Sequence, residues 1–464
     1  MSIVSAVMVP HPPMIIPEVG KGTEAMIQIT IDAYEKASQF VAATKPDTVI
    51  VASPHNVLYT DYFNISDGEH AVGSLEAFDA DDVRLEVDYD TELIAEFCRL
   101  ADRDKVDAGL LGQRGEYRNL DHATLIPLYF LRKNYTDFKV VRIGLSGLPY
   151  SDHYRVGMLL KEASENTGRR VAFIGSGDLS HKLSPFGPYG FADEGPYYDE
   201  QIMDVMGDAS FGKLLDFDPV FCEKAAECGH RSFIIMAGAL DRTSVTPEKL
   251  SYQDVTGVGY GVCTYTINDP DETRNFLDQW SVKKAAELSE KKKNEDSYVK
   301  LARKTIETYV RTGQKIPVPE DLPSEMTDRK AGVFVSLHKE GQLRGCIGTI
   351  KGLRDSVARE IIENAISSST RDTRFHAVQA DELDKLEYSV DVLSPAEQVH
   401  SLAELDVKKY GVIVTKGAQS GLLLPNLDGV DTPMEQIKIA KRKAGIPVSD
   451  NNIKVYRFEV VRHF

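Results

Sequence analysis

The stretch SIVSAVMVPHPP, residues 2–13, joins a mainly apolar run to a proline, His11 and two further prolines. A short apolar run bounded by prolines is typical of a buried strand, because proline cannot donate to a sheet ladder and ends the pairing. The stretch DTVIVASPHN, residues 47–56, repeats this design and places His55 directly after Pro54. Both stretches therefore predict a buried strand that is followed at once by a proline and a histidine.

Further strands and helices alternate with these two stretches. Strand-like runs cover residues 139–146, 169–177 and 257–269, and helical periodicity covers residues 23–43, 91–103 and 154–168. Strands that alternate with helices are typical of a parallel sheet covered by helices. The sequence therefore predicts an α/β N-terminal domain with a largely parallel central sheet, over residues 1–270.

The second half of the chain has a different texture. Residues 281–300 are rich in charge, and we expect a charged linker over residues 271–296. Beyond it, the sequence predicts hairpins and helices that make an α+β domain with a mainly antiparallel sheet, over residues 297–464. The predicted elements are hairpins at 331–350 and 410–425, helices at 301–313, 360–370 and 434–446, and strands at 386–394 and 454–464.

Length and composition narrow the class of protein. A chain of 464 residues is expected to form two domains, and a net charge of −17 argues against a nucleic-acid surface. No run of residues approaches the length of a membrane span, and the N-terminus lacks the pattern of a signal peptide. The five scattered cysteines argue against a disulfide framework and favour the cytoplasm: Cys98, Cys222, Cys228, Cys263 and Cys346.

Three histidines follow predicted strands, namely His11, His55 and His181. The carboxyl ends of parallel strands meet at one edge of a sheet, so these side chains are expected to converge. Zinc bound by three histidines, or iron bound by two histidines and a carboxylate, would fit such a cluster. The alternative interpretation is that each histidine is an ordinary loop or capping residue.

A candidate carboxylate is Glu227, which precedes the apolar run of AAECGHRSFIIMAGAL, residues 225–240. A carboxylate beside an apolar run is costly unless it is paired or bound to a metal. The alternatives are a carboxylate at the positive end of a helix, or a salt bridge to Arg231.

Five motifs in order resemble the class III extradiol ring-cleavage dioxygenases, and most closely the catalytic subunit of protocatechuate 4,5-dioxygenase. They are PHPP, SPHN, LDHATLIPLYFL (residues 120–131), GSGDLSH and ECGHRS, and the resemblance covers residues 1–270. It implies a non-haem Fe(II) held by His11, His55 and Glu227, with His181 as the acid/base and His122 near the substrate. It also implies a catechol-like or aminophenol-like aromatic substrate, O₂ as co-substrate and a homo-oligomer.

The related Memo family shares this fold, but there a cysteine takes the place of the carboxylate. Glu227 and Cys228 are adjacent here, so the resemblance leaves both ligands open. With Cys228 as the third ligand, the metal would be Fe(II) or another divalent ion such as zinc or copper.

The second half resembles the AMMECR domain over residues 297–464. The motifs are LRGCIGTI (343–350), STRDTRFHAV (369–378), YSVDVLSP (388–395) and GLLLP (421–425). A Memo-like domain beside an AMMECR domain resembles the AmmeMemoRadiSam set, which implies a separate radical-SAM protein as partner.

Within LRGCIG, Arg344 lies two residues from Cys346, and a nearby cation lowers the pKa of a thiol. The alternative is that Cys346 is a small buried side chain on a hairpin.

Two functions follow for the whole chain. The first is an Fe(II)-dependent extradiol-type dioxygenase in aromatic compound metabolism, with an appended AMMECR domain. The second is a metal-binding, non-dioxygenase component of a radical-SAM-associated modification system.

Overall fold

The computed structural model describes residues 2–111, 119–427 and 429–464. The chain divides into two compact units, Met1–Val282 and Lys283–Phe464. The division falls inside the charge-rich segment, most of which forms the helix α9 (Phe276–Asn294).

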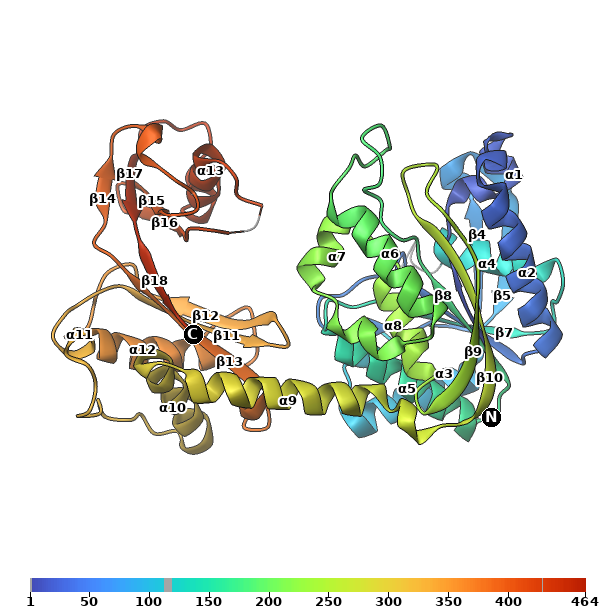
Figure 1. Cartoon of the computed structure of the whole chain (residues 1–464), viewed down its shortest axis with the longest axis horizontal. Helices are drawn as coiled ribbons and strands as arrows, with labels where there is room; N and C mark the ends of the chain where they lie inside the picture. The colour runs from blue at the N-terminus through green and yellow to red at the C-terminus, as the bar shows by residue number, and fades with distance from the viewer. Residues whose placement is uncertain (1, 112–118, 428) are drawn as a thin grey trace. The chain divides into compact units, whose positions relative to one another are not determined.

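The first unit is built on a six-stranded sheet with the order β7-β2-β8-β1-β10-β9 (Figure 1). The first four strands run parallel, and β10 and β9 pair antiparallel at one edge. The predicted α/β class with a largely parallel sheet is therefore confirmed. The bounds are β1 (Ile3–Val9), β2 (Thr48–Ser53), β7 (Lys139–Gly144), β8 (Val171–Ser176), β9 (Thr243–Gln253) and β10 (Tyr260–Pro270).

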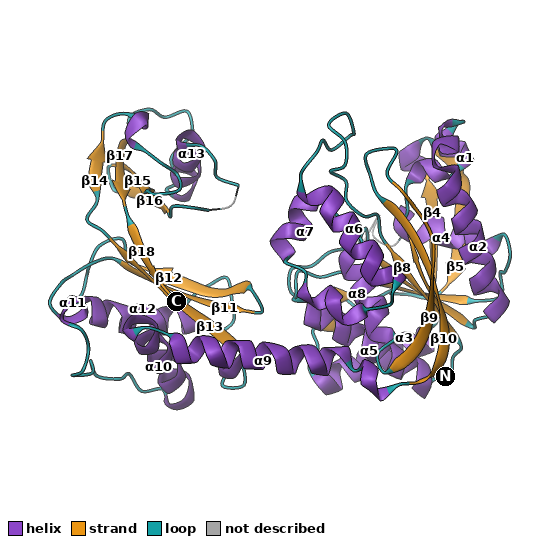
Figure 2. Ribbon diagram, viewed as in Figure 1, coloured by secondary structure: helices purple, strands orange, loops and turns teal. Residues whose placement is uncertain are grey.

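Helices cover both faces of this sheet (Figure 2). On one face α2 packs against α4, β1 and β10, and on the other α5 packs against α8, which contacts β8 and β2. The helices are α1 (Pro17–Gly20), α2 (Gln28–Thr44), α3 (Thr91–Asp104), α4 (His122–Arg132), α5 (Tyr150–Asn166), α6 (Glu194–Gly207), α7 (Pro219–Ala225) and α8 (His230–Ala239).

Outside the central sheet, the chain makes the antiparallel pair β4 (His70–Leu75) and β5 (Ala80–Asp88). The short strands β3 (Phe63–Asn64) and β6 (Ala108–Gly109) pair in parallel. The sequence did not predict these strands or β9, because their alternating or short apolar patterns carry a weaker signal than the continuous runs of the buried parallel strands.

The second unit contains two four-stranded antiparallel sheets, with the orders β12-β11-β13-β18 and β14-β17-β15-β16. Helices α10 and α12 pack on the first sheet, and α13 packs on β15 and β16 of the second. The predicted α+β class is confirmed. The strands are β11 (Val333–Lys339), β12 (Gln342–Gly348), β13 (Leu386–Leu393), β14 (Glu397–Val399), β15 (Gly411–Lys416), β16 (Gln419–Leu423), β17 (Lys454–Phe458) and β18 (Val460–His463), and the helices are α10 (Ser297–Thr312), α11 (Ser324–Thr327), α12 (Val357–Thr370) and α13 (Pro433–Lys443).

The chain end differs from the prediction of a single strand over residues 454–464. It divides at Glu459, so that β17 joins the second sheet and β18 joins the first. Among the helices of the described residues, none is both long and apolar enough to cross a membrane.

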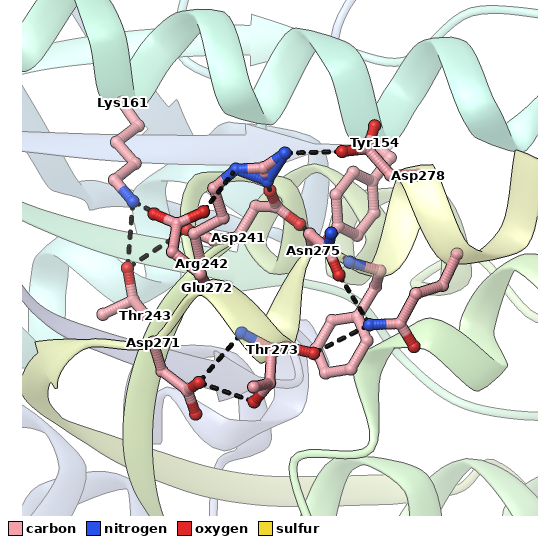
Figure 3. A network of polar contacts seen from close by, with 12 residues as sticks. Tyr154, Lys161, Asp241, Arg242, Thr243, Asp271, Glu272, Thr273, Asn275 and Asp278 are labelled. Atoms are coloured by element: carbon pink, nitrogen blue, oxygen red, sulfur yellow. Dashed lines mark hydrogen bonds and ion pairs between the residues drawn. The ribbon is translucent and has the colours of Figure 1, made fainter.

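Asp241 connects helices α5 and α9 through hydrogen bonds (Figure 3). Its buried Oδ1 accepts hydrogen bonds from the Tyr154 hydroxyl at 2.7 Å and from the backbone N–H of Phe276 at 3.1 Å. Lys161 donates to the backbone carbonyl of Asp241 at 2.7 Å. The carboxylate therefore joins α5 to the first residue of α9.

We expect the substitution Asp241→Ala to lower the free energy of unfolding of the first unit by about 1–3 kcal/mol, because it leaves the buried Tyr154 hydroxyl without its acceptor. Asp278→Ala is the matched control, since it removes an exposed ion pair with Arg242 in the same network and should cost less than about 1 kcal/mol. Trp280 is the single tryptophan and packs against this core, so its fluorescence during urea unfolding reports both variants. Equal losses of unfolding free energy in the two variants would contradict the role assigned to Asp241.

Candidate metal centre

Three histidine rings meet at the carboxyl edge of the parallel strands. His11 lies two residues beyond β1, His55 lies two residues beyond β2, and His122 begins α4. The Nε2 atoms of His11 and His55 are 3.1 Å apart. The His122 ring stacks on His55 with a centroid distance of 4.4 Å and lies 5.3 Å from the ring of His11.

Cys228 adds a sulfur atom to this group. Its Sγ lies 3.5 Å from Nε2 of His11, and the ligand atoms of His11, His55 and Cys228 all lie within 4.8 Å of one another. The backbone N–H groups of Cys228 and Gly229 donate to the carbonyl of Asp178 at 3.3 and 3.2 Å. The loop after β8 therefore holds the segment before α8 in place.

Two glycines allow this close approach. A Cβ atom built on Gly177 would lie 2.0 Å from the Cα of Gly229, a distance that no side chain tolerates. Glycine is therefore required where the end of β8 meets the start of α8, and this contact brings Cys228 to the edge of the sheet.

The tautomer of His11 follows from its hydrogen bonds. The Ser176 hydroxyl donates its one hydrogen to the carbonyl of Ala123 at 2.7 Å, so it can only accept from Nδ1 of His11, at 3.0 Å. Nδ1 of His11 therefore carries the proton, and Nε2 presents a lone pair to His55 and Cys228. The Asp178 carboxylate also accepts from the backbone N–H of His11, at 2.7 Å.

A second polar group fixes His55 and His122. The carboxylate of Asp121 caps α4 through the N–H of Thr124 at 2.9 Å and accepts from the Ser53 hydroxyl at 2.6 Å. Ser53 in turn accepts from the backbone N–H of His55 at 3.3 Å. Asp121 also pairs with the buried Arg142 at 3.5 Å, which ties this group to β7.

Burial determines the charge state of the histidines. It is the main cause of the lowered pKa values of His11, His55 and His122, and it lowers the pKa of His122 to about 4. These imidazoles are therefore neutral at pH 7. Burial also raises the pKa of the Cys228 thiol well above its usual value. A bound metal cation would lower the pKa of the Cys228 thiol, because metal coordination favours the thiolate.

Glu227, which the resemblance implies as the third ligand, contacts the start of α8. Its Oε2 accepts a hydrogen bond from the backbone N–H of His230, the first residue of α8, at 2.6 Å. Burial raises its pKa to about 7. The structure thus shows the helix-terminal carboxylate that was the alternative interpretation, while Arg231 donates to the carbonyl of Leu148. The helix N-terminus attracts the carboxylate, and Cys228 occupies the position beside the histidines.

His181 lies on the loop after β8 with its ring partly buried. Burial lowers the pKa of His181, and hydrogen bonds with the backbone of Ala226 and Leu179 act against this shift. The ring of Tyr189 meets the His181 ring edge to face, with a centroid distance of 4.9 Å.

Comparison with known protein families identifies a family for each half of the chain. Residues 5–263 match the family described as the catalytic LigB subunit of aromatic ring-opening dioxygenase. The chain belongs to the LigB family. Residues 299–463 match the AMMECR1 family.

A relative of this LigB-family chain matches it over its whole length. The chain is 38% identical to protein CA_C1420 of Clostridium acetobutylicum, over 100% of this chain and 99% of the relative. A protein of Thermotoga maritima is 53% identical over 36% of this chain and 98% of its own length.

Two solved structures are also similar. The uncharacterized protein PH0010 of Pyrococcus horikoshii has 36% identity and a TM-score of 0.34, and it covers 36% of this chain and 88% of its own. The uncharacterized protein JW3007 of Escherichia coli K12 has 14% identity and a TM-score of 0.38, and it covers 56% of this chain and 99% of its own.

The AMMECR1 region contains the other two candidate residues. Cys346 lies on β12, and its thiol accepts a hydrogen bond from the Ser336 hydroxyl at 3.2 Å. Burial raises its pKa, and Arg344 pairs with Glu382 at 2.9 Å. This arrangement favours the structural role for Cys346 over a reactive thiolate.

Sequence patterns did not identify Ser176, Asp121 or Arg142 as parts of the LigB site. Ser176 stands within the quoted GSGDLSH motif and Asp121 within LDHATLIPLYFL, so the motifs contained the signal but not the hydrogen bonds. Arg142 lies within an apolar strand, where a charged side chain indicates a buried partner.

We expect Ser176→Ala to weaken metal binding roughly 10- to 100-fold, because Nδ1 of His11 would lose the acceptor that fixes its tautomer. Ser5→Ala is the control, since Ser5 is also buried, lies on the neighbouring β1 and meets Thr44 instead. Anaerobic titration of the full chain with zinc and a competing chelator measures both. An unchanged affinity in Ser176→Ala would contradict the assigned tautomer.

Proposed function

We propose that the LigB unit binds a catalytic metal ion through His11, His55 and Cys228. We further propose that it acts, with Fe(II), as an extradiol-type oxygenase on a catechol-like or aminophenol-like aromatic. The observation that carries this proposal is the convergence of two imidazole nitrogens and one thiol at the carboxyl edge of the sheet, with His122 and His181 in the surrounding loops and helix ends.

The donor set fits a metal ion. The imidazoles of His11 and His55 are neutral, and Nε2 of His11 is deprotonated. Two nitrogens and a thiolate accommodate Fe(II), zinc or copper. When bound, Fe(II) would stabilise a deprotonated hydroxyl as a Lewis acid and would mediate electron transfer from the aromatic substrate to O₂.

The protein residues would perform the proton transfers and hold the substrate. Burial lowers the pKa of His181 and keeps its imidazole neutral, so it is suited to accept a phenolic proton and to return it later. His122 is fixed by its stacking on His55 and by an edge contact with Phe78, with centroids 5.3 Å apart. Its role in the proposal is to contact the substrate hydroxyl.

A second candidate function is a metal-binding component without dioxygenase activity, which works with a radical-SAM protein. The observation that favours it is the thiol of Cys228 beside the histidines, in the position where an extradiol site would carry a carboxylate. A thiolate favours softer metals than a carboxylate does.

We expect Cys228→Ala to weaken zinc and Fe(II) binding by roughly 10-fold or more, as the loss of one of three ligands would. Glu227→Gln should change the affinity little, because a side-chain amide can still accept from the N–H of His230. Anaerobic metal titration of the two variants of the full chain compares these adjacent residues directly. A larger loss of metal affinity in Glu227→Gln than in Cys228→Ala would show that Glu227 is the ligand.

The activity itself is tested with anaerobically purified protein loaded with Fe(II). We expect O₂ uptake in a 1:1 ratio with ring opening when a panel of catechols and aminophenols is supplied, and loss of this activity in His181→Gln with its iron retained. An oxygen electrode and the loss of aromatic absorbance measure the two events. Stoichiometric iron without O₂ uptake on any diol would instead support the second candidate function.

A further inference from the structure

An ordered hairpin follows His181 directly and covers residues 182–192. Leu183 pairs with Phe191 in an antiparallel bridge, and the N–H of Ala192 donates to the carbonyl of Lys182 at 3.1 Å. The N–H of Leu183 also donates to the carbonyl of Gly257, which lies in the turn between β9 and β10, at 3.3 Å. The two turns lie side by side in Figure 1, above the ends of β8 and β9.

Tyr189 is held in place by this hairpin. Its backbone carbonyl accepts a hydrogen bond from Nζ of Lys182. Tyr189 is 54% exposed, whereas His181 is partly buried. The two rings meet edge to face at an interplanar angle of 88°.

This contact restrains the His181 ring through packing. Hydrogen bonds with the backbone of Ala226 and Leu179 also act on the imidazole. An edge-to-face aromatic contact adds a second restraint on the rotation of the ring. The ring of Tyr189 therefore helps to fix the orientation of His181.

We infer that Tyr189 is a positioning residue whose ring holds the His181 imidazole in the orientation needed for proton exchange with a hydroxylated aromatic substrate. The inference rests on the proposed function for the role of His181. The contact between the two rings does not depend on that role, so the two ideas can fail separately.

Chemical modification tests the contact itself. Diethyl pyrocarbonate acylates neutral imidazole nitrogens, and peptide mass analysis of the metal-loaded full chain gives the rate at His181. We expect a several-fold faster reaction in Tyr189→Ala, and wild-type rates in Tyr189→Phe and in Phe186→Ala. Phe186 is the matched control because it lies on the same hairpin and is 99% exposed.

Kinetics tests the positioning. With Fe(II)-loaded protein and a catechol that the wild type turns over, we expect Tyr189→Ala to lower kcat by about 2- to 13-fold. An aromatic pair contributes roughly 0.5–1.5 kcal/mol, and a barrier raised by that amount lowers the rate by this factor. The KM and the iron content should stay the same, and Tyr189→Phe should restore kcat.

Three results would overturn the inference. They are an unchanged modification rate in Tyr189→Ala, an equal acceleration in Tyr189→Phe, or an effect confined to KM. If the wild type oxidises no diol, the proposed function fails, while the modification rates still decide whether Tyr189 holds His181.

Discussion

The candidate metal centre depends on the short segment Ser176–Asp178 at the carboxyl end of β8. The Ser176 hydroxyl fixes the tautomer of His11, and the Asp178 carboxylate accepts the backbone N–H of the same histidine. The carbonyl of Asp178 accepts the N–H groups of Cys228 and Gly229, and Gly177 lets the two loops touch. Three consecutive residues therefore orient two of the three donors. Since β1 pairs with β8 in parallel, with Val9 opposite Ser176, strand register determines this geometry.

The different contacts of Cys228 and Glu227 follow from electrostatics at the start of α8. A helix N-terminus presents unpaired N–H groups and a partial positive charge, and a carboxylate is its best partner. Glu227 accepts the N–H of His230 there, while its neighbour Cys228 meets His11. A carboxylate that left the helix terminus for the metal would abandon this hydrogen bond. The thiol would give up only weak hydrogen bonds with the backbone of Asp178 when it binds a metal, because sulfur is a weak donor and acceptor.

Much of this arrangement could be predicted from the sequence. The continuous apolar runs before His11 and His55 predicted parallel strands, and the edge where such strands end predicted that the two rings would meet. The side chain of Glu227 could not be placed, because the sequence does not show whether a carboxylate beside a helix faces the helix or the metal. The division of residues 454–464 between two sheets was also missed. A break at Glu459 leaves the apolar pattern on either side unchanged. The halves differ in their partner strands, which are β14 and β15 for β17 and β13 for β18.

The account depends on sulfur coordination at the LigB site. X-ray absorption at the zinc edge of the zinc-loaded full chain measures it directly, because Zn–S distances are about 2.3 Å and Zn–N and Zn–O distances are roughly 2.0–2.2 Å. We expect one sulfur in the coordination shell of the wild type and of Glu227→Gln, and none in Cys228→Ala. A shell of nitrogen and oxygen alone in the wild type would contradict the assignment of Cys228 and restore the carboxylate triad.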